Sequence, residues 1–589
     1  MKFPKKINCI AMALALLASM TTLAAGSAIV DLSITGIDGS ALINLRQHLA
    51  AKTKMITENT PPRMVFNLFH NIPEQAKKAL APFGYFRATI NTTLSQKKNR
   101  WQIVVNVTKN QRMPLSTVSI QILGPGKNDP AFKQYLAKIN IKKGNYLDAQ
   151  KYDDAKENLK NMASNRGYFN AKFEQHQLKI DLRRYQASIV LIMNTGVRQK
   201  IGRTVFSKTP FNTSLLKRYL KYQTGEYYNN EALEKTRQNL INSQFFQAAS
   251  LKPITKKGIT TIKINLSTQD QVHYTLGAGY GTDNKFRGMA AMNIAWLNRN
   301  GHSMRALARG SNNNSEIGLH YQIPGQNPIL NQYHINVSLR HLNYGPSIGS
   351  AKNAQTNINY QTKWHSFQLQ TGLTYLTENY ELQNFPIKNT STKTNANILY
   401  PQLLLQTIQA TPNLISPNQG VSISFNLSAG SKALFSKNDF TRSFLQIKSI
   451  YTIEKTHTRI IARSNIGAIS IKNLINLPFS MQFYTGGSFS IRGFKYNSIG
   501  PGRHLFSSQF EVQQRIYKNL YLAGFIDCGN VTDKIFKRPL KIGAGPAIAY
   551  LSPIGAVELS FAKNISSQDP VSHRHNGGWH IHFSLGALL

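Results

Sequence analysis

The sequence predicts three α+β repeats followed by a sixteen-stranded antiparallel transmembrane β-barrel. Three observations lead to this prediction. A helix followed by an aromatic pair recurs before residue 270, and apolar and polar residues alternate in segments of roughly ten residues after it. Beyond residue 25, no apolar run reaches the about 18 residues of a membrane-spanning helix. Because lipid offers backbone groups no partner, such a chain crosses a membrane only as a closed barrel.

Residues 1–25 have the three-part layout of an export signal. A lysine-rich start precedes an apolar run that ends near Leu23, and small residues follow it. A retained membrane anchor is the alternative, but the run is short for one. Cys9 would leave with the signal, so Cys528 would be the only remaining cysteine and no intramolecular disulfide could form. Export without disulfides favours a bacterial envelope protein.

The chain is strongly basic, with a formal net charge of +44 from 70 Lys and Arg against 26 Asp and Glu. Such an excess indicates nucleic acid, anionic lipid or acidic partners. The excess runs through both halves of the chain, without a long basic run or zinc-finger spacing. We therefore expect no nucleic acid as a partner. The phosphates of outer-membrane lipid and lipopolysaccharide are the expected counter-charges.

The repeat is marked by a helix that leads into an aromatic pair and then into a strand. The three pairs lie at 85–86, 168–169 and 245–246. Units two and three also share a turn that precedes the marked helix, at 143–146 and 224–227. Stacked copies of one small module form an elongated arm, and its exposed strand edges can add a strand from a partner.

Each unit is predicted to run strand, two helices, two strands, with boundaries at 26–110, 111–196 and 197–269. Pro73 is expected in the first turn of its helix, where a missing N–H group is tolerated. The helix of the third unit is expected to be about one turn shorter. Only six residues separate Leu240 from Phe246, whereas ten separate Leu159 from Phe169.

The region 270–589 is predicted to form the barrel. Val272, Tyr274 and Leu276 lie on one face of the first segment, and polar or small residues lie on the other. Sixteen such segments start near 271, 287, 302, 315, 333, 355, 367, 395, 420, 440, 458, 505, 520, 540, 556 and 578. A soluble β-sandwich is the alternative, but the export signal and the number of segments weigh against it.

A long connection, residues 470–504, follows the eleventh segment. An even strand count places both ends of the barrel on the periplasmic side, so this connection is external and can fold back into the lumen. Glycines allow its backbone to pass close to the wall, and the planar fork of Arg492 suits a buried carboxylate. A glycine-rich surface loop is the plain alternative.

Two carboxylates are candidates for contact with Arg492. Phe506, Phe510 and Val512 are expected to face lipid, so Glu511 points inward, and the same alternation turns Asp527 inward. A carboxylate inside a barrel needs a cation. Arg492 is the candidate and Arg515 its competitor. Both carboxylates could instead be solvated in a wet lumen.

The sequence of this connection resembles a segment of a known protein family. Its motif residues resemble the external-loop signature of the BamA/TamA superfamily of outer-membrane assembly factors, at Gly486, Gly487, Ile491, Arg492, Gly493 and Phe494. The extension 495–501 resembles the TamA branch, and 279–283, 525–530 and 550–555 match as well. The resemblance implies that the repeats are POTRA domains in the periplasm and that the barrel lies in a bacterial outer membrane.

The resemblance also implies what such a protein does. It implies a translocation and assembly factor for unfolded outer-membrane clients, such as autotransporters and other β-barrel proteins, with a periplasm-spanning TamB-like partner in the inner membrane. It implies a barrel that opens sideways where its first and last strands meet, at Val272, Tyr274, Leu276, Gly277, Gly279, Ile581, Phe583 and Leu585. Glycines weaken strand packing there. A two-partner-secretion-type or passive porin-like channel is the alternative.

An enzyme is not expected. The sequence lacks GxxxxGK[ST], HExxH and GxSxG motifs. His580 and His582 share a lumenal face, where we expect them to be polar lining rather than metal ligands. We therefore expect no catalytic residue, metal or cofactor.

Overall fold

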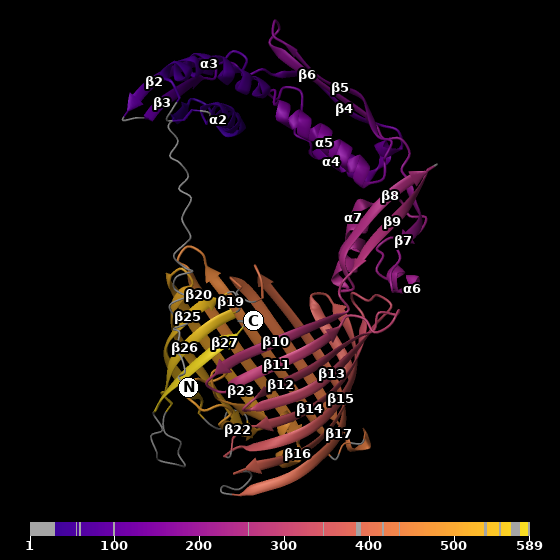
Figure 1. Ribbon diagram of the computed structural model, residues 1–589, viewed down its shortest axis with the longest axis vertical. Helices are drawn as coiled ribbons and strands as arrows, with labels where there is room; N and C mark the ends of the chain where they lie inside the picture. The colour runs from indigo at the N-terminus through magenta and orange to yellow at the C-terminus, as the bar shows by residue number, and fades with distance from the viewer. Residues whose placement is uncertain are drawn as a thin grey trace, which may run out of the picture. The chain divides into compact units, whose positions relative to one another are not determined.

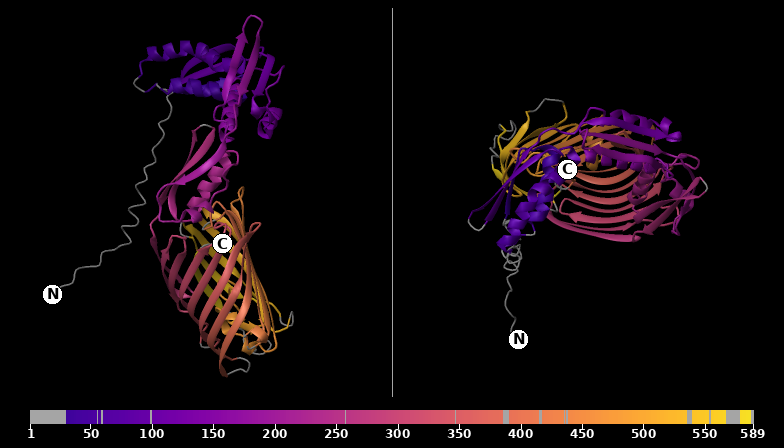
Figure 2. Two further views of the ribbon diagram at one scale, coloured as in Figure 1. Left: turned by 90° about the vertical axis from the view of Figure 1, so that its right-hand side faces the viewer. Right: turned by 90° about the horizontal axis from the view of Figure 1, so that it is seen from above.

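The computed structural model describes residues 30–586 except for 55, 58–59, 98–99, 257, 346, 385–389, 415–416, 435, 437, 535–538, 553–554 and 567–577 (Figures 1 and 2). The predicted export signal lies outside the described residues. The chain divides into two compact units. One holds the first two repeats with three short segments of the third, at 197–203, 224–231 and 255–260, and the other holds the remainder of the third repeat with the barrel.

Each repeat contains a three-stranded sheet in which the last strand is central. The sheet orders are β1-β3-β2, β4-β6-β5 and β7-β9-β8. In the first two sheets the central strand is parallel to the first and antiparallel to the second. The strands are β1 (Val30–Thr35), β2 (Thr89–Lys97), β3 (Arg100–Thr108), β4 (Leu115–Leu123), β5 (Lys172–Asp181), β6 (Gln186–Asn194), β7 (Lys200–Phe206), β8 (Phe246–Lys256) and β9 (Ile259–Thr268).

Two helices follow the first strand of each repeat, as the sequence predicted. They are α2 (Gly39–Thr53) and α3 (Pro62–Leu80), α4 (Pro130–Lys138) and α5 (Ala149–Asn165), and α6 (Thr213–Lys217) and α7 (Asn230–Asn242). The marked helix of the third repeat has 13 residues against 17 in the second, so the expected loss of one turn is confirmed. No helix among the described residues is long and apolar enough to span a membrane.

The position of Pro73 was predicted wrongly. The helix α3 begins at Pro62, so Pro73 lies in its interior and not in its first turn. A proline there removes one backbone hydrogen bond. The buried positions Val65, Ile72 and Ala76 lie on both sides of Pro73, and their packing holds the helix continuous.

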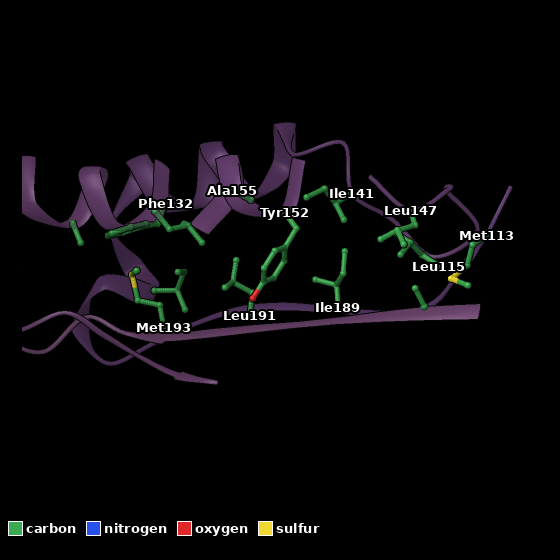
Figure 3. Close-up of a cluster of buried hydrophobic side chains, with 14 of the residues drawn as sticks. Met113, Leu115, Phe132, Ile141, Leu147, Tyr152, Ala155, Ile189, Leu191 and Met193 are labelled. Atoms are coloured by element: carbon green, nitrogen blue, oxygen red, sulfur yellow. The ribbon is translucent and has the colours of Figure 1, made fainter. Parts of the chain in front are cut away.

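The second repeat shows how each core forms. Side chains of α5, including Tyr152 and Ala155, face Ile189 and Leu191 on β6 (Figure 3). The strand β6 alternates buried and half-buried residues, because only one of its faces meets the helices. Burying one large apolar side chain contributes about 1.5–3 kcal/mol, so this layer stabilises the repeat.

The linker between the first and second repeats is held by main-chain and arginine contacts. The N–H group of Met113 donates to the carbonyl of Gly84 at 2.9 Å, and that of Leu147 donates to Met113 at 2.8 Å. The side chain of Arg112 donates to the carbonyls of Phe83 at 2.7 Å and Leu147 at 3.2 Å. One arginine therefore joins the end of one repeat to the shared turn of the next.

The same contacts recur one repeat later. Arg198 donates to the carbonyls of Arg166 at 2.8 Å and Tyr228 at 3.2 Å. Gln199 donates to Gly167, and Tyr228 donates to Gln199, both at 2.9 Å. We call these two contact sets the repeat junctions, centred on Arg112 and Arg198. They explain why the aromatic marker and the turn recur in the sequence.

The barrel consists of sixteen strands in chain order, each antiparallel to the next, which confirms the predicted count. They are β10 (Val272–Gly281), β11 (Lys285–Ile294), β12 (Ser303–Ser311), β13 (Asn314–Pro324), β14 (Gln332–Asn343), β15 (Gly349–Trp364), β16 (Phe367–Gln383), β17 (Ser391–Thr411), β18 (Gln419–Gly430), β19 (Phe440–Ile453), β20 (Thr458–Ile471), β23 (His504–Tyr517), β24 (Leu520–Thr532), β25 (Lys541–Ser552), β26 (Gly555–Asn564) and β27 (Trp579–Gly586). Only β15 starts much earlier than predicted, because polar residues occupy both of its faces at that end.

The two faces of the barrel wall differ as the alternation predicted. Tyr274 and Leu276 are 75% and 82% exposed on the outer face, whereas Glu511 and Asp527 are 2% and 0% exposed on the inner side. An apolar outer face suits lipid, and polar groups turn inward.

Candidate functional site: the lumenal loop and the barrel seam

The connection between β20 and β23 folds inside the barrel. Two short strands, β21 (Phe483–Thr485) and β22 (Ile499–Gly502), pair with each other within it. Its apolar side chains form one buried cluster with inner-wall residues of β16, β17 and β19, and the members from the connection are Leu474, Leu477, Met481, Phe483, Ile491 and Ile499. We call residues 472–503 the lumenal loop. It is a packed element and not an exposed surface loop.

Arg492 lies at the centre of a buried ionic cluster. Its Nε and Nη2 atoms donate to the two carboxylate oxygens of Asp527 at 2.8 and 2.9 Å. Its Nη1 atom donates to Glu511 at 2.6 Å and to Glu558 at 2.9 Å. The guanidinium carbon lies 3.5 Å from the ring centroid of Phe525. This bidentate and stacked arrangement uses the planar fork that a lysine lacks.

The electrostatics of the cluster depend on its burial. Arg492 is 1% exposed. Burial alone disfavours its charged form, but Asp527, Glu511 and Glu558 outweigh that effect and raise the pKa of Arg492 above its usual value. Removing one partner of such a group leaves uncompensated buried charge, which costs about 3–5 kcal/mol.

The structure decides between the two arginines that the sequence offered. Arg515 is exposed, whereas Arg492 contacts both predicted carboxylates. The alternative of solvated carboxylates does not hold, because Glu511 and Asp527 are buried. Glu511 is also held by Gln513, whose Nε2 atom donates to it at 2.7 Å.

The glycines of the motif stand where the loop meets the wall. Gly493 has a φ of +92°, and a Cβ atom there would lie 3.1 Å from the backbone of Asn564. A Cβ atom on Gly487, at φ +100°, would lie 2.7 Å from a carboxylate oxygen of Asp283. Only glycine fits both positions without strain. Ile491 is fully buried in the loop cluster, and Phe494 packs against that cluster.

A second set of contacts anchors the other half of the loop. Glu378 on β16 is 1% exposed and accepts from the backbone N–H of Ser480 at 3.0 Å and from Asn353 at 2.9 Å. Arg442 on β19 donates to the carbonyl of Met481 at 2.9 Å. The loop is therefore fixed to the wall at two separate places along the barrel.

Among the described residues, the first and last strands of the barrel meet only at one end. The N–H of Thr282 donates to the carbonyl of Phe583 at 3.2 Å, and the N–H of Phe583 donates to the Thr282 hydroxyl at 3.1 Å. Arg287 reaches the carbonyl of Leu585 at 2.5 Å. We call this meeting of β10 and β27 the seam. The sheet order runs from β10 to β27 without a ladder between them.

Of the eight predicted seam residues, Phe583 bonds Thr282 just after β10, and the carbonyl of Leu585 accepts from Arg287 on β11. Within the described part of the chain, the other six make no hydrogen bond across the seam, and they are Val272, Tyr274, Leu276, Gly277, Gly279 and Ile581. The edge of β10 that faces away from β11, from Val272 to Gly279, therefore has no paired strand among the described residues.

The lumenal loop contacts both strands of the seam. The N–H and hydroxyl of Ser488 donate to Asp283, just after β10, at 2.7 and 2.6 Å. Asp283 lies 3.6 Å from Nδ1 of His582 on β27, and the N–H of Gly493 points at Nε2 of that histidine at 3.5 Å. The loop thus joins β10, β27 and the Arg492 cluster.

Sequence reasoning missed several of these residues. Glu558 and Glu378 face the lumen by strand alternation, which is the same signal that identified Glu511 and Asp527. Asp283 is the last residue of the segment 279–283, which was singled out only because it resembles the BamA/TamA superfamily. His582 had been assigned to the polar lining; its ring lies 6.3 Å from that of His580, and no group of three or more potential metal ligands occurs among the described residues.

Comparison with known proteins agrees with this architecture. Residues 297–587 match the Omp85 superfamily domain, residues 31–109 match the POTRA domain TamA domain 1, and residues 128–195 match the POTRA family described as surface antigen variable number repeat. BamA from Haemophilus ducreyi lacking POTRA domains 1-3 is similar in fold, with 17% identity, a TM-score of 0.68 and coverage of 80% of this chain and 99% of that one. CdiB from Acinetobacter baumannii matches at 13% identity and a TM-score of 0.44, over 80% and 90% of the two chains.

A sixteen-stranded barrel with an apolar outer face, preceded by POTRA repeats, defines an outer-membrane protein whose arm lies in the periplasm. The chain is a member of the Omp85 superfamily, and its first repeat matches the TamA-type POTRA domain. It is an insertion or translocation factor of the bacterial outer membrane.

Proposed function

We propose that this protein inserts unfolded outer-membrane clients, autotransporters and other β-barrel proteins among them, by adding client strands at the seam. The unpaired edge of β10 is the observation that supports this proposal. Each unsatisfied backbone group at membrane depth costs several kcal/mol. A client strand that pairs with β10 would satisfy these groups, in the manner of strand addition at any free sheet edge.

The lumenal loop would control access to that edge. It holds Asp283 beside β10 and approaches His582 on β27, while Arg492 fixes it to β23, β24 and β26. A client strand entering the seam would separate Asp283 from His582, and the loop would keep its anchor on the wall. The barrel could then open locally without losing its shape.

The POTRA arm would receive the client before the barrel does. Its edge strands are candidates for strand addition, and the TamA-type first domain favours a TamB-like partner that spans the periplasm from the inner membrane. No nucleotide, metal or cofactor is needed, because folding of the client supplies the free energy. The protein would act without catalytic chemistry.

The test is reconstitution of the full chain in proteoliposomes with a urea-unfolded autotransporter barrel as client. We expect faster client folding than in empty liposomes, measured by heat-resistant mobility on gels. Single-channel recording in planar bilayers should show small or erratic conductance, because the loop fills the lumen. Large steady conductance without faster client folding would instead support a passive or two-partner-secretion channel.

A further inference from the structure

Two hollows adjoin each other on the outer face of the barrel, across strands β10 to β17. The larger has a volume of about 1170 Å³, and Leu276, Ile317 and Leu339 line it. These three side chains are 82%, 64% and 57% exposed and point away from the lumen. Thr377 and Asn379 also line it, and although the inward Glu316 and Asn353 touch it as well, most of its lining residues lie at outward positions. The hollow therefore opens to the lipid side of the wall.

The larger hollow is an apolar groove because its wall is made of small residues. Gly288, Ala290, Ala308 and Gly310 form its floor on β11 and β12. A Cβ atom on Gly288 would meet nothing within 4 Å. Small residues leave the surface of the groove recessed. Linear hydrocarbon chains fit such a groove, because they gain dispersion contacts with its floor and its sides.

The smaller hollow has a volume of about 430 Å³ and is polar. It shares His341, Lys352 and Asn379 with the groove and adds Lys393. His341 and Lys352 stand directly opposite each other on β14 and β15. Among the described residues neither side chain has an ionic partner, and Lys393 has only Glu381 at 3.8 Å. The acid Glu381 also lines this hollow, so two lysines and one histidine share a single carboxylate. Such an excess of neighbouring cations is unfavourable unless a further anion joins them.

The position of the polar hollow identifies the leaflet. The strand β14 is fifth in the barrel order and runs outward like β10, so its end at Asn343 and the start of β15 at Gly349 are external. His341 and Lys352 are close to these ends. The polar hollow thus lies at the level of the outer-leaflet headgroups, with the apolar groove beside it.

We propose that these hollows form one binding site for a phosphorylated, multi-chain lipid of the outer leaflet, which is lipopolysaccharide. Its lipid A phosphates would contact Lys352, Lys393 and His341, and its acyl chains would lie in the groove. A peptide strand fits less well, because it needs backbone partners and the strands of the groove from β11 to β16 already pair on both sides, which leaves only the edge of β10. Lipid binding here does not rest on client insertion at the seam, although Leu276 on β10 borders both the groove and the seam.

The test uses the full chain in detergent and measures bound lipid A by native mass spectrometry. Each lysine near an anionic headgroup contributes about 1 kcal/mol, so K352Q/K393Q should bind lipid A roughly 30-fold more weakly. Lys534, which is exposed just after the external end of β24, provides the matched control. The variants K534Q and wild type should bind equally, and dephosphorylated lipid A should bind to wild type as weakly as lipid A does to K352Q/K393Q.

The groove is tested separately with G288F, which fills it from a position with open space. We expect weaker binding of lipid A with unchanged strand content by circular dichroism. Equal binding of lipid A to wild type, K352Q/K393Q and G288F would overturn the proposal. Binding of dephosphorylated lipid A as tight as that of lipid A would overturn it too, and competition by an unfolded client peptide alone would assign the groove to protein instead.

Discussion

The repeat junctions and the barrel seam each join separate elements of the chain, but they do so through different contacts. Each junction combines main-chain hydrogen bonds with an arginine that donates to carbonyls on both sides. Among the described residues, the seam has one main-chain bond from Thr282 to Phe583, two hydrogen bonds of the Thr282 hydroxyl with Phe583 and one long arginine side chain. Its remaining stability comes from the loop through Asp283 and His582.

The difference shows where this protein can move. A ladder of backbone bonds resists opening, because all of its groups would lose their partners at once. The seam has few such groups to lose, and the loop contacts that support it are polar contacts that an entering strand can replace. The junctions therefore suit a fixed arm geometry, and the seam suits opening.

The largest expected effect comes from closing the seam covalently. T282C/F583C in a C528S background should form a disulfide under oxidising conditions and abolish client folding in proteoliposomes, and a reductant should restore it. The pair T377C/N397C, across the complete β16–β17 ladder, is the control and should not affect folding of the client. Full activity of the oxidised T282C/F583C protein would show that the wall need not open.

Removal of the loop anchor should have the next largest effect. Arg492→Ala leaves Asp527 and Glu511 buried without a cation, at a cost of about 3–5 kcal/mol. We expect protease added outside whole cells to cut the loop in this variant and not in wild type. Arg492→Lys should restore protection only partly, and Arg515→Ala, at an exposed site, should have no effect. If the protease cut the loop of the wild type as readily as that of Arg492→Ala, then Arg492 would not anchor the loop.

A junction arginine should matter less, because its hydrogen-bond partners are neutral carbonyls and the ion pair of Arg198 with Asp129 is long, at 3.8 Å. Arg198→Ala loses two charge-assisted hydrogen bonds at a partly exposed site, and we expect a loss of about 2 kcal/mol. Limited proteolysis should then cut near the predicted boundary at 196, and Arg112→Ala should cause the same near 110. Unchanged cleavage in both variants would show that the main-chain bonds alone hold the junctions.

The smallest effect is a pH dependence in the second repeat. Asp129 caps the start of α4. Burial by itself would raise the pKa of its carboxyl. The carboxylate accepts hydrogen bonds from Arg166 at 2.8 Å, Ala131 at 3.0 Å and Tyr168 at 3.0 Å, and these bonds outweigh the effect of burial and lower the pKa. The stability it contributes is therefore present above its unfolded pKa of about 3.9 and is lost as pH falls through the lower folded value.

Thermal unfolding should show this loss as the pH falls below about 4, and D129N should remove the pH-dependent part while lowering stability at pH 7 by about 1–2 kcal/mol. D153N is the control, because Asp153 carries an exposed ion pair with Lys156 that contributes little. An identical acid transition in D129N and wild type would contradict the assignment.

Much of the fold could be predicted because its signals are local. Strand alternation has a period of two residues, so it located sixteen segments and turned Glu511 and Asp527 inward. The helix, aromatic pair and turn recurred often enough to delimit three repeats. Pro73 was misplaced for the opposite reason: a local preference for the first turn was overridden by packing on both sides of it.

The sequence by itself determined the kinds of elements, their order and the inward direction of the lumenal carboxylates, because each depends on residues a few positions apart. Only the tertiary structure decided that Glu558 joins Arg492, that Asp283 meets Ser488 and His582, and that Lys352 and Lys393 adjoin an apolar groove. These residues lie on separate strands, and the register and closure of the barrel set the distances between them. No local pattern in the chain encodes those distances.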